Sequence, residues 1–147
     1  WDVNARGSFF GLTRGAGKPQ LCRAVLESIA FEVADLVDAM NAESGTPMTE
    51  LRVDGGASVS NFMMQFQSDI LSLPVLRPTM VETTAAGAAF LAGLAIGVWS
   101  GTEELSKLQE TDRIFRPDMA QPQRINLLHN WHTAVELSRM WGARAKN

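Results

Sequence analysis

The chain of 147 residues is poor in cysteine and carries no excess of positive charge. Its single cysteine, Cys22, excludes an intrachain disulfide and a cysteine-based metal framework, and favours a reducing compartment such as the cytoplasm. The formal net charge of -3 argues against nucleic acid or an anionic membrane as the main partner, because both reward clustered positive charge. A small polar ligand or another protein fits this composition better.

The first residues, Trp1 to Arg6, have neither the basic start nor the apolar stretch of a signal peptide, and the first of them is not methionine. We therefore expect the chain to be a piece of a longer protein. Its 46% hydrophobic and 20% charged residues are typical of a globular domain with a core and argue against disorder.

One stretch, Thr83 to Thr102, contains no charge, but its strongly apolar part is too short to cross a bilayer. Ala85, Ala89, Gly93 and Gly97 recur every four residues in it, which places small side chains on one helical face. In a membrane this spacing is an association motif, and in a soluble domain it indicates a tightly packed internal helix. Because polar residues flank the stretch, we expect the soluble form and no membrane span.

Apolar spacing and the positions of Gly and Pro predict strands that alternate with helices. Such alternation favours an α/β layer over a helical bundle or a β-sandwich. The predicted strands cover residues 8–12, 51–53, 74–77 and 113–116. The predicted helices cover residues 19–44, 62–70 with Ser60 as the cap, 85–97, 102–109 and 122–141.

Several apolar positions in the predicted helices have the spacing of a buried face. In helix 19–44 the expected buried stripe consists of Cys22, Val25, Leu26, Ile29, Val33, Leu36, Val37 and Met40. In helix 122–141 the shared face consists of Leu127, Trp131, Ala134, Ser138 and Trp141. We also expect core positions, rather than a hydrophobic ligand box, for Phe62, Met63, Met64 and Phe66.

Two histidines, His129 and His132, stand three residues apart on a predicted helix, a spacing that could serve a metal ion. No third ligand is evident, so we expect both side chains to face solvent and predict no metal site. A solvated face is also the expectation for a charged group in the last third of the chain, which consists of Glu103, Glu104, Lys107 and Glu110.

The segment Arg52 to Ser58 carries the most chemical information, because its Asp54-Gly55-Gly56 lies between a predicted strand and a predicted helix. Ligands of open α/β sheets bind beyond the carboxyl ends of strands, and glycine there lets the backbone approach a ligand closely. This geometry suits a nucleotide, but Asp-Gly-Gly is also an ordinary turn. Neither the Walker pattern nor the Gly-x-Gly-x-x-Gly fingerprint occurs, so the nucleotide class would be a different one.

Three runs near the N-terminus resemble the second sequence signature of the FGGY carbohydrate kinases at every defined position, with matching spacing. They are Gly7 to Leu12, Gln20-Leu21 and Ala24 to Glu27. Within that family, five segments are similar to the glycerol kinase branch rather than to xylulose or gluconate kinases: Ala5 to Gly7, Phe10 to Gly15, Arg52 to Gly56, Gln65 to Leu71 and Gly87 to Ala95. The resemblance extends from Trp1 to about Pro117.

The resemblance implies a fold and an activity. FGGY kinases have two ribonuclease H-like domains of the actin-like ATPase superfamily, with ATP and substrate in the cleft between them. We therefore expect an α/β fold with helices packed on a small mixed sheet, in which residues 1–147 are the C-terminal part of the C-terminal domain and the N-terminal domain is absent. The implied reaction transfers the γ-phosphoryl group of Mg-ATP to glycerol, and the implied partners are ATP, Mg²⁺, glycerol and further copies in a homo-oligomer.

The resemblance also implies a nucleotide-binding role for four residues. Gly56 matches the glycine whose backbone lies against the nucleotide, and Gly55 supports the turn. Ser60 occupies a position where glycerol kinases usually have an asparagine near the adenosine; a hydroxyl is shorter and has fewer donors, so Asn61 is an alternative. Asp54 could organise either the loop or the waters of a metal ion, and we favour the loop.

No catalytic residue is assigned to this chain, because in the family the catalytic aspartate, the phosphate loops and the glycerol-binding residues come from chain that precedes Trp1. Two other functions stay open from sequence alone. The segment could be a non-catalytic nucleotide-binding or interaction module, or it could belong to another FGGY sugar kinase.

Overall fold

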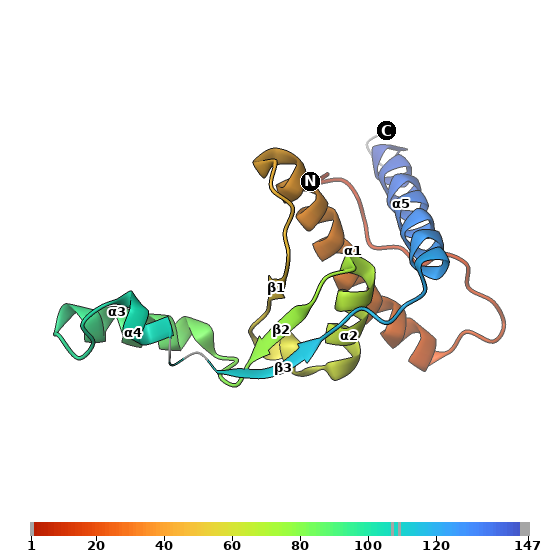
Figure 1. Ribbon diagram of the computed structural model, residues 1–147. Helices are drawn as coiled ribbons and strands as arrows, with labels where there is room; N and C mark the ends of the chain where they lie inside the picture. The colour runs from red at the N-terminus through yellow and green to blue at the C-terminus, as the bar shows by residue number, and fades with distance from the viewer. Residues whose placement is uncertain (1, 107, 109, 145–147) are drawn as a thin grey trace.

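The computed structural model describes residues 2–106, 108 and 110–144, in which five α-helices and a small sheet are found. Figure 1 shows their arrangement. Strands and helices alternate over most of the chain, as predicted. In chain order the elements are α1 (Lys18–Ser44), β1 (Leu51–Arg52), the 3-10 helix η1 (Gly56–Val59), α2 (Asn61–Leu71), β2 (Val75–Pro78), α3 (Thr83–Ala95), α4 (Thr102–Ser106), β3 (Thr111–Phe115) and α5 (Gln121–Arg144).

The sheet is small and mixed, as expected from the sequence. Its strand order is β1-β2-β3, with β1 parallel and β3 antiparallel to the central β2. Leu51 pairs with Val75 in the parallel register, and Val75 pairs with Phe115 in the antiparallel one. Because β2 is the central strand, it is hydrogen-bonded both to β1, which precedes it in the chain, and to β3, which follows it.

Helix α1 begins and ends close to the predicted positions, because strong local signals mark both ends. Pro19 lies in the first turn, where its missing N–H is not needed, and the side chain of Gln20 accepts a hydrogen bond from Gly17 N at 3.0 Å. Gly45 has φ of 65°, a left-handed conformation that suits glycine, and donates to Asn41 O at 3.1 Å.

The main core lies where α1, α2 and α5 meet. Phe31 of α1 packs edge-on against Phe66 of α2, with ring centroids 5.5 Å apart, and stacks on Trp131 of α5 at 5.3 Å. The amide of Gln67 donates to Ala30 O at 3.1 Å, so the polar atom buried in this contact is satisfied. The buried residues of this core are Ala30, Phe31, Ala34, Val37, Phe66, Ile70 and Leu71.

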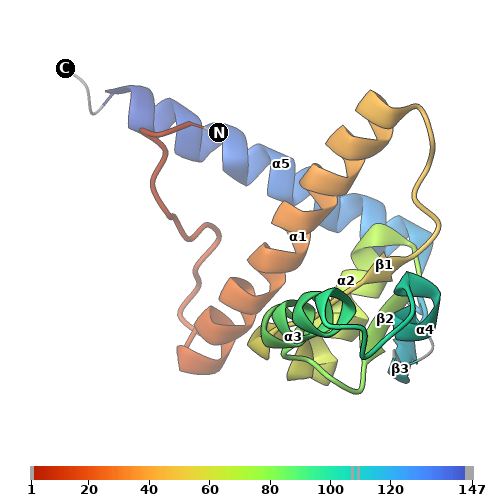
Figure 2. The ribbon, with the colours of Figure 1, turned by 90° about the vertical axis from the view of Figure 1, so that its left-hand side faces the viewer.

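Polar contacts hold α5 across α1, and the two helices cross in Figure 2. The carboxylate of Asp35 accepts from Trp131 Nε1 at 2.8 Å and lies 3.0 Å from His132 Nε2. Helix α5 is also bonded to α2, because Arg124 Nε donates to Ile70 O at 2.6 Å. His129 and His132 are both exposed, as predicted.

The predicted strand at residues 8–12 is wrong. Residues 5–10 form no helix or strand, and the side chains of Phe9, Phe10 and Leu12 are about half exposed. A strand exists only when its backbone pairs with a neighbour, and the described residues supply no such neighbour here. A short apolar run bounded by glycines was thus not sufficient to identify a strand.

The predicted buried stripe of α1 is wrong for five of its residues. The buried face consists of Ala30, Phe31, Ala34 and Val37, whereas Leu26 and Val33 of the stripe are only half-buried. The face that the described chain leaves uncovered consists of Cys22, Val25, Ile29, Leu36 and Met40, all exposed. Helix α1 therefore has two adjacent apolar faces, and α2 and α5 pack on one of them.

Helix α3 is not the tightly packed internal helix that its small residues predicted. Figure 1 shows α3 and α4 projecting away from α1, α2 and α5 as an arm. Ala85, Ala89 and Gly97 are exposed, and the buried Gly93 lies against Trp99 of the same arm. Among the described helices, none has the length and apolar character to span a membrane.

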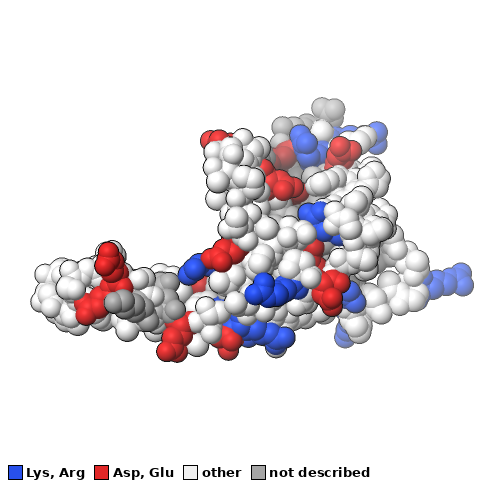
Figure 3. Space-filling model, viewed as in Figure 1, with Lys and Arg blue, Asp and Glu red and all other residues white. Residues whose placement is uncertain are grey.

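The remaining surface predictions have mixed outcomes. Met63, Met64 and Phe66 are buried as expected, but Phe62 and Trp141 are exposed because no described element covers their outer faces. The charged group predicted to be solvated is exposed at Glu103, Glu104 and Glu110, and Lys107 lies outside the described residues. Figure 3 shows acidic side chains on the arm and charges of both signs interspersed on the rest of the viewed face.

One acidic residue of the arm has a shifted pKa. The backbone N–H of Ser100 and then its hydroxyl donate to Glu104 Oε2 at 2.8 and 3.0 Å, and these bonds hold the pKa of this exposed carboxyl below its ordinary value. The shift is a local feature of the turn between α3 and α4.

The uncovered face of α1 leads to a prediction about the 147-residue chain alone. Exposed apolar faces promote association, so the purified chain should self-associate with rising concentration in sedimentation velocity and melt at low temperature. Ile29→Lys combined with Leu36→Lys should reduce this association, whereas Ala39→Lys, at an exposed position outside the stripe, should not. A chain that stays monomeric at high concentration and melts sharply at high temperature would contradict the prediction.

Candidate functional site

The segment Asp54-Gly55-Gly56 lies at one edge of the sheet, beyond the carboxyl ends of two parallel strands. Leu51 N donates to Pro74 O at 2.9 Å and Val53 N donates to Leu76 O at 3.0 Å, so β1 and β2 run side by side up to the loop. In an open α/β sheet this edge is where ligands bind. The structure therefore has the segment beyond the carboxyl ends of the strands, as the sequence predicted, and its role as a ligand site stays a prediction.

The two glycines have the conformation and the space that a close ligand requires. Gly55 has φ of 78°, which a residue with a side chain rarely adopts, and its N–H donates to Val81 O at 2.8 Å. Gly56 is exposed, and a Cβ built on it would meet no protein atom within 4 Å. One side of the backbone at Gly56 is thus open, and the fold does not itself require glycine at this position.

The carboxylate of Asp54 is engaged within the protein. Its Oδ2 accepts a hydrogen bond from the hydroxyl of Thr83, the first residue of α3. This contact and the bond from Gly55 N to Val81 O attach the loop to the base of the arm. The structure agrees with the loop-organising role that we favoured for Asp54.

Ser60 and Asn61, the two alternatives for a polar contact, have different environments at the start of α2. The hydroxyl of Ser60 accepts from Met63 N at 3.3 Å and caps the helix, as predicted. Asn61 is exposed, and its Oδ1 accepts from Arg77 Nη1 at 3.0 Å. The structure brings both residues next to the glycine turn, since only η1 separates Gly55 from Ser60.

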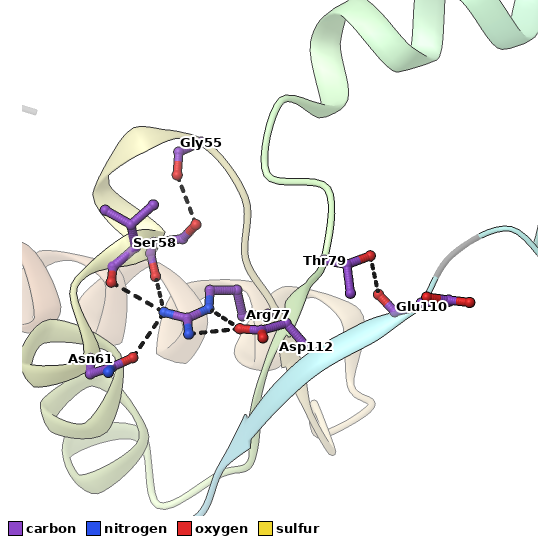
Figure 4. A network of polar contacts seen from close by, with 8 residues as sticks. Gly55, Ser58, Asn61, Arg77, Thr79, Glu110 and Asp112 are labelled. Atoms are coloured by element: carbon purple, nitrogen blue, oxygen red, sulfur yellow. Dashed lines mark hydrogen bonds and ion pairs between the residues drawn. The ribbon is translucent and has the colours of Figure 1, made fainter.

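Arg77 of β2 is a residue of this site that sequence reasoning missed (Figure 4). Its Nη1 donates to Ser58 O at 2.9 Å and to Val59 O at 3.2 Å, while Nε and Nη2 lie 2.8 and 2.7 Å from Asp112 Oδ2 on β3. The only signal in the sequence is a charged residue inside a short strand. Its partners are 16 to 35 residues away, which no local pattern reveals.

Two concave surfaces of the chain lie away from the glycine loop. One of about 460 Å³ lies between Phe9, Phe10 and the end of α5, and one of about 490 Å³ lies between α1, α2 and α5. Neither is lined by the glycine loop, in which Gly56 is exposed. Among the described residues no group of three or more His, Cys, Asp or Glu could hold a metal ion.

The fold and the loop define a class of protein. Residues 1–96 match the model of the C-terminal domain of the FGGY family of carbohydrate kinases. The match covers more than half of the 147 residues, so the chain belongs to the FGGY family of carbohydrate kinases. Solved structures of the family superimpose on the chain, which confirms the predicted actin-like ATPase fold.

Within the family the chain is similar to glycerol kinases. It is 52% identical over 141 residues to the glycerol kinase of Trichlorobacter lovleyi, covering 96% of this chain and 28% of that protein. The structure of Plasmodium falciparum glycerol kinase with ADP matches with a TM-score of 0.81 and 34% identity, over 94% of this chain and 28% of that one. A xylulose kinase from Lactobacillus acidophilus matches with a TM-score of 0.71 and 30% identity, over 97% and 28%. The chain thus spans under a third of the length of the relatives it matches.

Proposed function

We propose that the chain is part of an ATP-dependent glycerol kinase, which transfers the γ-phosphoryl group of Mg-ATP to glycerol and gives glycerol 3-phosphate. The observation that carries the proposal is the 52% identity to a curated glycerol kinase across 96% of the chain. Among the solved structures, the identity is 34% to a glycerol kinase and 30% to a xylulose kinase over similar shares of the chain. This difference supports glycerol over a sugar as the substrate.

The part proposed for this chain is one wall of the nucleotide site. The open backbone at Gly56, with Gly55 supporting the turn, would lie against ATP, and Ser60 or Asn61 would contribute the adjacent polar contact. Two findings support this assignment: the loop lies at the ligand-binding edge of the sheet, and the similar Plasmodium falciparum structure is a complex with ADP. Of the two polar candidates we favour Asn61, because the hydroxyl of Ser60 already caps α2.

Phosphoryl transfer needs chemical groups that we do not assign to this chain. It requires an in-line nucleophile, a group that accepts its proton, and donors around the moving phosphoryl group, while Mg²⁺ neutralises phosphate charge. Asp54 is engaged by Thr83, and the described residues contain no carboxylate cluster that fits a metal ion, so we assign neither a metal ligand nor a catalytic residue here.

The missing parts are proposed to come from the remaining length of the enzyme. In this proposal residues 1–147 form the C-terminal part of the C-terminal domain, and the proton acceptor, the phosphate loops and the glycerol pocket belong to the rest of the protein. We further propose that the complete enzyme is cytoplasmic and forms a homo-oligomer.

The proposed substrate leads to a direct test on the complete protein. A coupled assay of ADP formation should give a kcat/KM for glycerol at least about 100-fold above that for xylulose or gluconate, because a polar pocket built for one hydroxyl pattern rejects another strongly. A preference for a sugar would instead support another FGGY sugar kinase. Nucleotide binding without phosphoryl transfer to any of the three would support the non-catalytic module.

A further inference from the structure

Arg77 joins the sheet to the glycine turn, and we propose that it is a positioning residue for the nucleotide. In this inference Arg77 holds η1 and the amide of Asn61 in the positions from which they contact ATP, and Arg77 does not contact ATP itself. The inference rests on the proposed nucleotide wall and extends it to a residue on β2. Three features of the network carry it.

The first feature is that η1 ends on carbonyl groups that Arg77 satisfies. The end of a helix leaves carbonyl oxygens without helical donors, and those near the protein interior need another partner. Nη1 of Arg77 donates to Ser58 O and Val59 O, and Ser58 is fully buried. Because η1 begins at Gly56, the guanidinium sets the position of the turn that carries the open glycine backbone.

The second feature is that Arg77 cannot move easily. Nε and Nη2 both lie within 2.8 Å of Asp112 Oδ2 on β3, and the guanidinium carbon lies 5.3 Å from the centre of the Phe115 ring. Its side chain is only 12% exposed. The Nε and Nη2 groups of Arg77 face Asp112, and its Nη1 group faces the loop carbonyls. The planar fork of arginine provides donors in all of these directions, and a lysine does not.

The third feature is the orientation of Asn61. A guanidinium has only donors, so the atom of Asn61 that faces Nη1 at 3.0 Å must be the carbonyl oxygen. The amide NH₂ of Asn61 is therefore directed away from Arg77. Since Asn61 is exposed, these donors lie at the surface at the start of α2, and in this inference a nucleotide bound against the glycine turn accepts a hydrogen bond from them.

The test uses the complete enzyme and Arg77→Met, which keeps an apolar side chain of similar reach and removes every donor. We expect KM for ATP to rise about tenfold, the effect of losing one well-placed polar contact, with KM for glycerol unchanged. The matched control is Arg113→Met. Arg113 pairs with Arg77 across the sheet and lies 4.8 Å from the same Phe115 ring, but among the described residues it donates no hydrogen bond to the loop.

A second pair of variants separates positioning from general stability. Arg77→Lys keeps the ion pair with Asp112 but cannot also reach both carbonyls and Asn61, so its KM for ATP should lie between wild type and Arg77→Met. In an Asn61→Ala background, Arg77→Met should raise KM for ATP by less than it does alone, because both changes remove one shared contact. Thermal melting of all variants shows whether each is folded.

The outcomes distinguish this inference from the function on which it rests. A wild-type enzyme that shows no ATP-dependent activity overturns the proposed function and the role of Arg77 with it. An active wild type whose KM for ATP is unaffected by both Arg77 variants overturns the role of Arg77 alone. Equal rises in KM for ATP and for glycerol would also overturn it, since that pattern indicates a general structural role.

Discussion

The purified 147-residue chain should form no ADP from ATP in the presence of glycerol, whereas the complete protein should do so in the same coupled assay. The reason is the proposed division of parts: the open backbone at Gly56 would supply one wall of the nucleotide site, and the proton acceptor and the phosphate loops are proposed to belong to the rest of the protein. A site that stabilises the transition state must surround the phosphoryl group with donors, and one wall cannot.

Contaminating kinases are the main hazard in this assay, so the control is a chain prepared in parallel with Gly56→Val. Trace activity from a contaminant would be the same in both preparations. Turnover that co-elutes with the pure chain and is lost in the variant would show that the catalytic groups lie within these 147 residues and that the proposed division of parts is wrong.

Gly56→Val in the complete enzyme should raise KM for ATP by about 10- to 100-fold and leave KM for glycerol near its wild-type value. A Cβ built at Gly56 meets no protein atom within 4 Å, so we expect the variant to keep the fold of the described chain, which thermal melting checks. It would instead occupy the space proposed for the nucleotide. Steady-state kinetics with each substrate varied in turn measures the two constants.

Two companion variants make this result specific to the loop. Gly101→Val adds the same side chain at another glycine where no protein atom lies within 4 Å, in the turn between α3 and α4, and should leave KM for ATP unchanged. Ser60→Asn restores the residue expected from the family resemblance and should be tolerated, because asparagine is as good a helix cap as serine. Wild-type constants for Gly56→Val would show that the nucleotide wall has been placed wrongly.

The elements predicted correctly are those that local chemistry determines. Pro19 and Gly45 mark the ends of α1, and the Ser60 hydroxyl caps α2, because each acts within one turn of the helix it begins or ends. The position of the glycine loop followed from the same kind of signal, a strand running into Asp54 and Gly55. Such features need no knowledge of what packs against them.

The predictions that were wrong concern features that depend on what packs against a helix or strand. Periodicity finds an apolar face but not the partner that covers it, so Ile29 and Leu36 were assigned to a core that the described chain does not supply. The exposed small-residue face of α3 has the same explanation. Arg77 escaped notice because its role exists only once β2, β3 and η1 are in contact. The nucleotide-binding roles of Gly55, Gly56, Ser60 and Asn61 stay predictions.

The arm formed by α3 and α4 leaves and rejoins the sheet at neighbouring points. Thr79 N donates to Glu110 O at 2.9 Å, so the two ends of the excursion are as close as the ends of a hairpin. The arm is therefore a separable insertion: a tight turn joining Thr79 to Glu110 would leave the pairing of β2 with β3 in place. Such a shortened chain would keep the support from Arg77 and lose that from Val81 and Thr83, which allows the two supports of the glycine loop to be weighed separately.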